Sequence, residues 1–200
     1  KSYPFYSRNF GTFNGNKGWD IVEVNKEKLT ELISKSQIQD KVKEIAVDIS
    51  QKYAGEAPIL IGILNGSFIF CADLMREMDI NCEIDFIKVS SYTGTASVGT
   101  VKLRKDISAD ITNRHVVIVE DIIDSGLTIK FIKDRMLEAG PKSVAIVTLL
   151  IKPDIAKLDF KIDWVGFEIP PEFVVGYGLD YDQLYRNLKA IYRLEALESE

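Results

Sequence analysis

The residues best suited to chemistry lie in one segment, His115–Thr128, which reads HVVIVEDIIDSGLT. Three carboxylates, Glu120, Asp121 and Asp124, follow its apolar run. Clustered carboxylates repel one another and any phosphate nearby, unless they bind hydroxyl groups or a divalent cation. Mg²⁺ accepts hard oxygen ligands from protein and phosphate together. These residues therefore indicate a polyol ligand and Mg²⁺.

The polar residues that come next suit a phosphate group. Gly126 would let the backbone approach a ligand closely, and the hydroxyls of Ser125 and Thr128 can donate hydrogen bonds. The helix expected to begin here offers unpaired amide groups, which favour anions. A simple helix cap at an acidic strand end is the alternative interpretation, because Asp and Ser commonly cap helices.

Apolar runs predict the strands that must position these groups. The runs at residues 59–64 (ILIGIL), 116–120 (VVIVE) and 143–151 (SVAIVTLLI) are short and unbroken, which is typical of strands covered on both faces. Helical stretches follow the first two runs and end near Met78 and Ala139. The alternation predicts an α/β fold with a central parallel sheet flanked by helices. Ligands of such sheets bind at the carboxyl ends of the strands.

The remaining segments predict peripheral structure. Apolar spacings of three and four predict one or two amphipathic helices from Asn25 to about Tyr53. Residues 82–92 alternate as a strand does, and the glycine-containing residues 93–100 predict a mobile loop before a short VKL strand. The short strands WVGFEI, FVVGYG and IYRL predict a small cap, built together with the aromatic arm of residues 1–20. We expect a single domain, with its core at about 25–151 and its cap at about 1–24 and 152–200.

Composition and charge exclude several classes of partner. The net charge of −5 arises from 25 basic and 30 acidic residues scattered along the chain, which disfavours binding to nucleic acid. No run reaches the roughly 18 apolar residues of a membrane span, so no membrane partner is expected. Cys71 and Cys82 have neither disulfide nor metal-ligand spacing, which favours a reducing, cytoplasmic compartment. The single histidine, His115, is interpreted as structural.

The run VVIVEDIIDSGLT also resembles the phosphoribosyl diphosphate (PRPP) motif of type I phosphoribosyltransferases. Further matches from about Pro58 to Leu194 resemble the hypoxanthine-guanine branch of that family, which has a cap, or hood, beside its central sheet. The resemblance implies that residues 124–128, Leu127 included, bind the 5′-phosphate. It also implies that Glu120 and Asp121 bind ribose hydroxyls or Mg²⁺, and that Asp124 is the general base or acid at purine N7.

The diphosphate side of the site is also implied by resemblance. Asn65 and Gly66 match the diphosphate loop of the family, in which a lysine usually stands where this sequence has Asn65. Ser91 and Tyr92 match the flexible catalytic loop that closes over the reacting centre and excludes water. Arg186 matches an arginine that contacts the diphosphate, a role that suits its planar guanidinium.

The residues implied to bind the purine lie nearer the carboxyl terminus. Lys152 matches the lysine that donates to the purine 6-oxo group, Phe173 the aromatic ring that stacks on the purine, and Val174 a backbone contact to its edge. Asp180 matches the carboxylate associated with a second Mg²⁺. Out of this context, Phe173 would be assigned to the core and Lys152 to a solvated strand end.

The implied reaction transfers the phosphoribosyl group of PRPP to N9 of hypoxanthine or guanine, giving IMP or GMP and diphosphate. The implied partners are these small molecules and Mg²⁺, in a homodimer or homotetramer. Two other functions fit part of the pattern. A regulatory protein on the same fold would need a basic RNA-binding face, which this acidic sequence lacks. A phospho-accepting receiver domain would leave Lys152, Phe173 and Asp180 unexplained.

Overall fold

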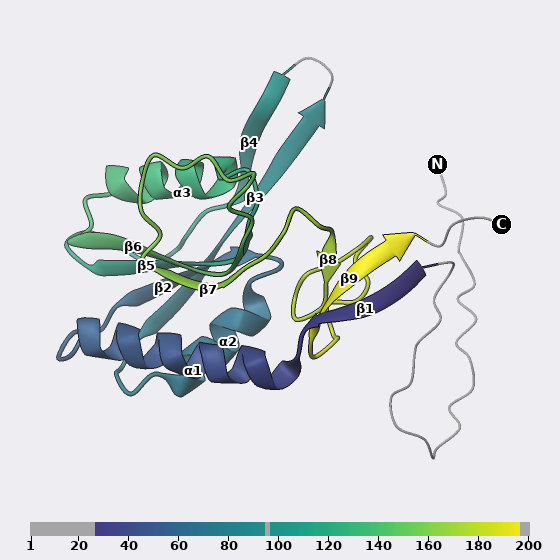
Figure 1. Cartoon of the computed structure of the whole chain (residues 1–200). Helices are drawn as coiled ribbons and strands as arrows, with labels where there is room; N and C mark the ends of the chain where they lie inside the picture. The colour runs from purple at the N-terminus through teal and green to yellow at the C-terminus, as the bar shows by residue number, and fades with distance from the viewer. Residues whose placement is uncertain (1–26, 95–96, 197–200) are drawn as a thin grey trace, which may run out of the picture.

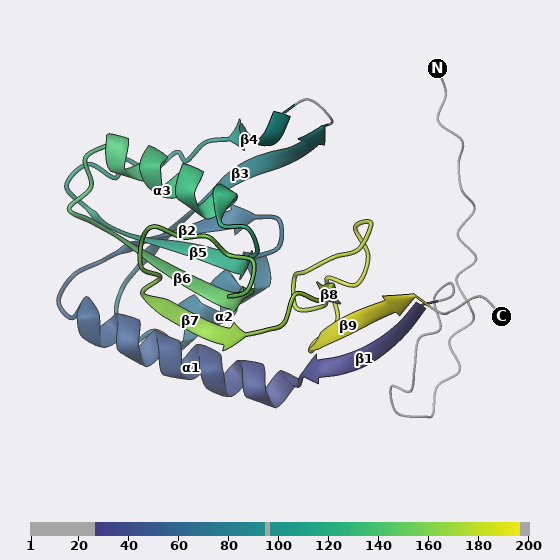
Figure 2. The same cartoon turned by 45° about the horizontal axis from the view of Figure 1, so that its top comes forward.

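The computed structural model describes residues 27–94 and 97–196, and these residues form two sheets (Figures 1 and 2). The larger sheet has six strands in the order β4-β3-β2-β5-β6-β7. Neighbouring strands run parallel except β3 and β4, which are antiparallel. The expected α/β fold with a mostly parallel central sheet is confirmed. The strands are β2 (Ile59–Leu64), β3 (Glu83–Gly94), β4 (Ser97–Lys105), β5 (His115–Ile123), β6 (Ser143–Ile151) and β7 (Trp164–Glu168).

Helices cover both faces of this sheet. Helix α3 (Leu127–Glu138) packs on one face, and α1 (Lys35–Lys52) and α2 (Phe68–Glu77) pack on the other (Figures 1 and 2). Successive residues of β5 point to opposite faces, so Val117 and Val119 join the core under α1 and α2, whereas Ile118 joins the core under α3. Burial on both faces explains why this strand is an unbroken apolar run.

The first described segment corrects an expectation. Residues 27–33, expected to be helical, form strand β1 (Glu27–Ile33), and the helix begins at Lys35. Ser34 is its N-cap in a capping box with Gln37, which fixes this boundary. The strand forms because it pairs antiparallel with β9 (Ile191–Ala196), a partner too distant in the sequence for local spacing to reveal.

Strands β1, β9 and β8 (Val174–Val175) form a second sheet beside the first, here named the cap sheet (Figure 2). Its loop between β8 and β9, residues 176–190, is named the cap loop. Strand β7 was expected in the cap but pairs with β6 in the central sheet, because Trp164 and Phe167 pack against the main core. The aromatic arm of residues 1–20 lies outside the described residues.

The segment expected to be a mobile loop is also different. Strand β3 continues to Gly94 and β4 begins at Ser97, and the two pair as a hairpin that projects beyond the central sheet (Figure 1). Antiparallel hydrogen bonding extends both strands past the residues that the sequence marks as strand.

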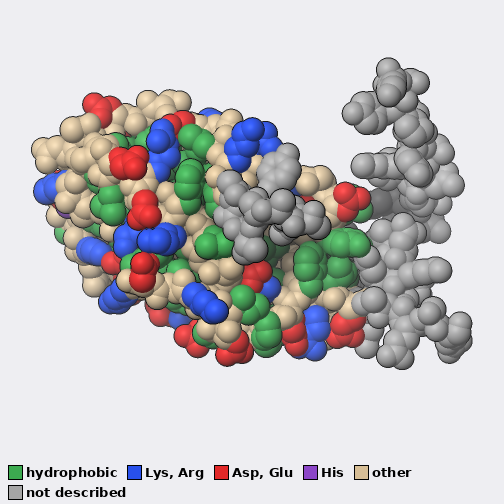
Figure 3. Space-filling model, turned by 90° about the horizontal axis from the view of Figure 1, so that it is seen from above, with side chains coloured by type: hydrophobic (Ala, Val, Ile, Leu, Met, Phe, Trp, Pro, Cys, Tyr) green, Lys and Arg blue, Asp and Glu red, His purple; other side chains and the backbone are tan. Residues whose placement is uncertain are grey.

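None of the helices in the described ranges is long and apolar enough to cross a bilayer. On the face shown in Figure 3, basic and acidic side chains are interspersed rather than gathered into one field.

Candidate active site

Glu120 and Asp121 lie near the carboxyl end of β5, and Asp121 is partly exposed. The Glu120 side chain is buried, and its Oε1 accepts a hydrogen bond from the Asp121 backbone N–H at 3.3 Å. Burial, together with the charge of Asp121, raises the pKa of Glu120 well above its ordinary value. Burial also raises the pKa of Asp121, although its hydrogen bonds and the charge of Arg186 oppose this. Two adjacent carboxylates, one buried and one half-buried, need hydroxyl donors or a cation as partners.

The loop of residues 124–126, here named the Ser125 loop, joins β5 to α3. Gly126 has a φ of +86° and precedes the first turn of the helix, a backbone conformation that glycine adopts without steric cost. The Ser125 Oγ accepts a hydrogen bond from the Leu127 N–H at 3.4 Å. A cavity of about 80 Å³ lies here and is lined by Glu120, Ile122, Ile123, Asp124, Ser125, Gly126, Thr128 and Ile129. The arrangement can receive a phosphate at a helix amino terminus.

Asp124 and Lys152 face each other across this end of the sheet. The Lys152 Nζ lies 3.6 Å from the Asp124 Oδ2, and the Lys152 backbone N–H donates to the Ile123 carbonyl at 3.0 Å. Lys152 is buried, whereas 57% of the Asp124 side chain is exposed. The structure thus brings a ligand-accessible carboxylate and a buried ammonium together.

The loop of residues 65–67, here named the Asn65 loop, joins β2 to α2 and lies beside β5. A Cβ atom at Gly66 would overlap the Asp121 carboxylate, so the loop backbone and that carboxylate are in close contact. The peptide bond between Leu64 and Asn65 is cis. The Lys88 Nζ, on β3, donates to the Asn65 Oδ1 at 3.2 Å. No feature of the sequence around Lys88 marked it as a site residue, since its proximity to the Asn65 loop follows from the register of β2 and β3.

The cap loop closes over the Asn65 loop from the other side. A Cβ atom at Gly178, where φ is +102°, would overlap the Gly66 carbonyl oxygen. The Arg186 Nη1 donates to the Gly178 carbonyl at 2.7 Å, and its Nη2 forms an ion pair of 2.7 Å with the Asp180 Oδ1. Asp180 and Arg186, both predicted for the site, are therefore paired with each other on the cap loop, whose Gly178 is in close contact with Gly66.

A hydrogen bond anchors the cap loop to the core. The Tyr177 hydroxyl donates to the Asp73 Oδ2 of α2 at 2.8 Å. Burial and then the hydrogen bond to Asp73 raise the pKa of the Tyr177 hydroxyl. Sequence reasoning missed this pair, and the two glycines that flank Tyr177 were the available signal of a tight backbone approach.

Phe173 lies at the outer edge of the site with its ring accessible. Its side chain is 52% exposed and packs edge-on against Tyr181, with ring centroids 5.8 Å apart. The Val174 side chain is buried, so its backbone is the part that can face a ligand. Ser91 and Tyr92 lie on β3 and pair with Val101 and Thr100, and their side chains are outside the described part of the structure.

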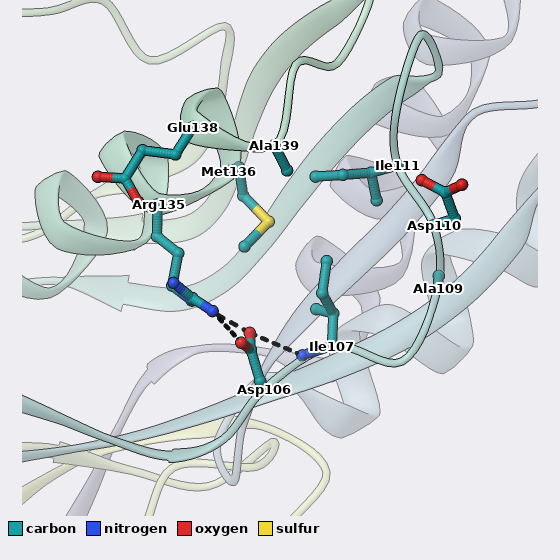
Figure 4. A pocket seen from close by; sticks show the side chains of 9 residues that line it. All are labelled: Asp106, Ile107, Ala109, Asp110, Ile111, Arg135, Met136, Glu138 and Ala139. Carbon is teal, nitrogen blue, oxygen red and sulfur yellow. Dashed lines mark hydrogen bonds and ion pairs between the residues drawn. The ribbon is translucent and has the colours of Figure 1, made fainter.

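A separate pocket of about 330 Å³ lies between the last turn of α3 and the segment that joins β4 to β5 (Figure 4). An ion pair between Arg135 and Asp106 crosses it. Because α3 begins at the carboxyl ends of the strands, its last turn lies at the opposite edge of the sheet. None of the residues predicted for the site line this pocket.

The sequence and fold of the chain are similar to those of known proteins. Residues 30–182 match the family model of the phosphoribosyl transferase domain. The chain is 48% identical over 161 residues to the hypoxanthine-guanine phosphoribosyltransferase of Bacillus subtilis, which covers 80% of this chain and 89% of the relative. A solved hypoxanthine-guanine phosphoribosyltransferase from Bacillus anthracis is 46% identical, with a TM-score of 0.79 over 84% of this chain and 99% of its own.

A more distant solved structure has the same fold. The hypoxanthine phosphoribosyltransferase of Trypanosoma cruzi, in complex with the product IMP, is 36% identical, with a TM-score of 0.79 over 88% of this chain and 98% of its own. Sequence and structure therefore agree over most of the chain. The chain belongs to the phosphoribosyl transferase domain family, within its hypoxanthine-guanine phosphoribosyltransferase group.

Proposed function

We propose that the chain is a purine salvage enzyme that transfers the phosphoribosyl group of PRPP to N9 of hypoxanthine or guanine, releasing diphosphate. The convergence of three groups at one edge of the sheet carries the proposal. The Asp121 carboxylate meets the Asn65 loop at Gly66, the Ser125 loop opens a cavity at a helix amino terminus, and Lys152 lies beside Asp124. These positions suit a diphosphate, a sugar phosphate and a purine in turn.

The sugar phosphate would bind at β5 and α3. Ser125, Gly126 and Thr128 line the small cavity, and these residues, with the backbone of Leu127 at the start of α3, can donate to the 5′-phosphate. The two ribose hydroxyls would donate to Glu120 and Asp121, which supplies the partners that these two carboxylates need.

The same carboxylates fit Mg²⁺, since Mg²⁺ is usually held by one or two carboxylates together with substrate oxygens. Within the described ranges no three His, Cys, Asp or Glu side chains converge as a metal cage, so Glu120 and Asp121 would share the ion with the substrate. Asp180, beside Arg186, would serve a second ion. When bound, Mg²⁺ offsets the charge of the diphosphate.

The purine would bind between Lys152 and Phe173. The Lys152 ammonium has donors and no acceptor, so it selects a 6-oxo group and rejects a 6-amino group. The exposed Phe173 ring offers a surface for stacking, and the backbone of Val174 can contact the edge of the base. Asp124, 3.6 Å from Lys152, would then lie near N7.

The proposed reaction breaks the bond between ribose C1 and the diphosphate oxygen and forms the bond between C1 and N9. Asp124 accepts the proton that the purine loses, acting as general base. Asn65, Gly66 and Arg186 hold the leaving diphosphate, and closure of the β3–β4 hairpin at Ser91 and Tyr92 excludes water.

An initial-rate assay tests the proposal. The chain is incubated with PRPP, Mg²⁺ and each of hypoxanthine, guanine, xanthine and adenine, and nucleotide formation is followed by chromatography. We expect turnover with a 6-oxopurine and none with adenine, and the ratios of kcat/KM give the preferred base. Absence of turnover with every base, while PRPP still binds, would instead favour a regulatory protein.

We also propose a cytoplasmic homodimer or homotetramer. Both Cys71 and Cys82 are free thiols, and burial raises the pKa of the Cys71 thiol to about 12, which suits an unreactive thiol in a reducing compartment. A solved Trypanosoma cruzi relative was used to study how its C-terminal region affects oligomeric state and activity. Light scattering of the purified chain measures its oligomeric state directly.

A further inference from the structure

The Asn65 loop is an anionic environment for a ligand that is itself strongly anionic. The Asp121 carboxylate contacts Gly66, and Glu120 is adjacent to it. The loop sequence, Asn-Gly-Ser, contains no cation. Arg186 lies on the cap side of the loop, but its guanidinium is already paired with Asp180 at 2.7 Å. A diphosphate at this loop would therefore gain from a protein cation in addition to Mg²⁺.

Strand pairing places Lys88 where that charge is needed. Lys88 is the register partner of Leu64, the residue that immediately precedes the loop. Its Nζ donates to the Asn65 Oδ1 at 3.2 Å, so the amide holds the ammonium at the loop. Lys88 forms no ion pair with a carboxylate in the described part of the chain, unlike Lys105 on the neighbouring strand, which pairs with Asp85 at 3.3 Å.

Two further cations lie on the same face of the β3–β4 hairpin. Lys102 is the register partner of Ser90, and the Arg104 Nε donates to the Ser90 Oγ at 2.8 Å. Ser90 is two residues from Lys88, so the alternation of a strand puts all three cations on one face. Neither Lys102 nor Arg104 pairs with a carboxylate among the described residues. Positive charge therefore extends along the hairpin to the Asn65 loop.

We propose that Lys88, positioned by Asn65, binds the diphosphate group of PRPP and of the released product. The ammonium of Lys88 has three donors and gives one to Asn65, which leaves donors for phosphate oxygens. This inference rests on the proposed function for the identity of the substrate. The site itself is defined by a simpler ligand, inorganic diphosphate, whose binding can be measured without turnover.

The test compares four variants by calorimetric titration with inorganic diphosphate in the presence of Mg²⁺, and by KM for PRPP and for the purine. Lys88→Met should raise the Kd of diphosphate and the KM of PRPP about tenfold, the effect of one charge-assisted hydrogen bond, without changing the KM of the purine. Lys88→Arg should retain most of the affinity. Asn65→Lys in the Lys88→Met background should restore it, because it returns an ammonium to the same loop.

Lys43→Met, on the exposed side of α1, is the matched control and should leave all three constants unchanged. Thermal unfolding of each variant confirms that it is folded. Wild-type diphosphate affinity in Lys88→Met would overturn the proposal. So would a loss of affinity that neither Lys88→Arg nor the added lysine at position 65 repairs, since that pattern indicates packing rather than charge. If the wild type binds diphosphate through Lys88 but converts no 6-oxopurine, the proposed function fails and the Lys88 site stands.

Discussion

Replacing Gly66 with alanine should damage ligand binding more than it damages the fold. Gly66 has no positive φ, so alanine brings no backbone strain of its own. Its Cβ would overlap the Asp121 carboxylate, which is half-buried and adjacent to the buried Glu120. The methyl group can be accommodated if Asp121 turns away from the loop, and that movement removes a proposed ribose and Mg²⁺ ligand from its position.

The expected magnitude follows from the overlap. Inserting one methyl group into a packed site costs about 1–3 kcal/mol. For a chain of this length, each kcal/mol lowers Tm by roughly 2–4 °C. If the same 1–3 kcal/mol is lost from PRPP binding, the KM of PRPP should rise roughly 5- to 150-fold. The KM of the purine should change little, because the residues proposed for the base, Lys152 and Phe173, lie elsewhere.

Gly55→Ala is the matched control for this substitution. Gly55 has a φ of +81°, and a Cβ there would meet nothing within 4 Å, so alanine costs about 1 kcal/mol through backbone strain alone. Both variants should lose stability in thermal unfolding, but only Gly66→Ala should lose PRPP affinity in initial-rate and diphosphate-binding assays. Wild-type affinity in a folded Gly66→Ala protein would refute the argument that this loop and Asp121 bind the substrate as one unit.

Three other outcomes are expected. Asp124→Asn should lower kcat by roughly 10²–10⁴-fold in initial-rate assays, with little change in the KM of PRPP, because asparagine keeps the shape of the side chain but cannot act as a general base. An unchanged kcat would exclude the role of Asp124 as general base. Lys152→Ala should raise the KM of the 6-oxopurine roughly tenfold or more and spare PRPP, and a selective loss of PRPP affinity would contradict it. Burial opposes ionisation of Asp85, but hydrogen bonds from three backbone N–H groups and Lys105 outweigh it and lower its pKa to about 2. Because the folded pKa lies below the ordinary value of 3.8, the stabilisation is present above that pH and is lost as pH falls towards 2. Asp85→Asn should therefore lower the free energy of unfolding in urea by roughly 2 kcal/mol at neutral pH, and should flatten the decline of that free energy in acid. Identical curves of unfolding free energy against pH for both proteins would refute this.

Elements buried on both faces were predictable from the sequence. The unbroken apolar runs of β2, β5 and β6 correspond to strands between two helical layers, and the glycine and proline after Ala139 mark the end of α3. The Ser125 loop was predictable for a similar reason, since the geometry of a strand, a turn and a helix amino terminus is set by neighbouring residues.

Contacts between distant segments were not predictable in this way. Leu29, Leu32 and Ile33 have helical spacing, but they belong to strand β1 because that strand pairs with β9. The role inferred for Lys88 depends on its register with Leu64, and a shift of one residue would send its side chain to the opposite face. Tyr177 reaches Asp73 because the cap loop folds back onto α2.

The pairing of β1 with β9 also orders the assembly of the protein. In the described chain β1 is the first strand made and β9 the last, whereas all six strands of the central sheet are complete before β9 is synthesised. Closing so long a loop is slow compared with forming local contacts. We expect the sheet with its Ser125 loop to fold first, leaving β1 to find its partner at the end. Recognition of the base, which we propose to involve Phe173 and Val174 at the cap sheet, would then be the last property that a newly made chain acquires.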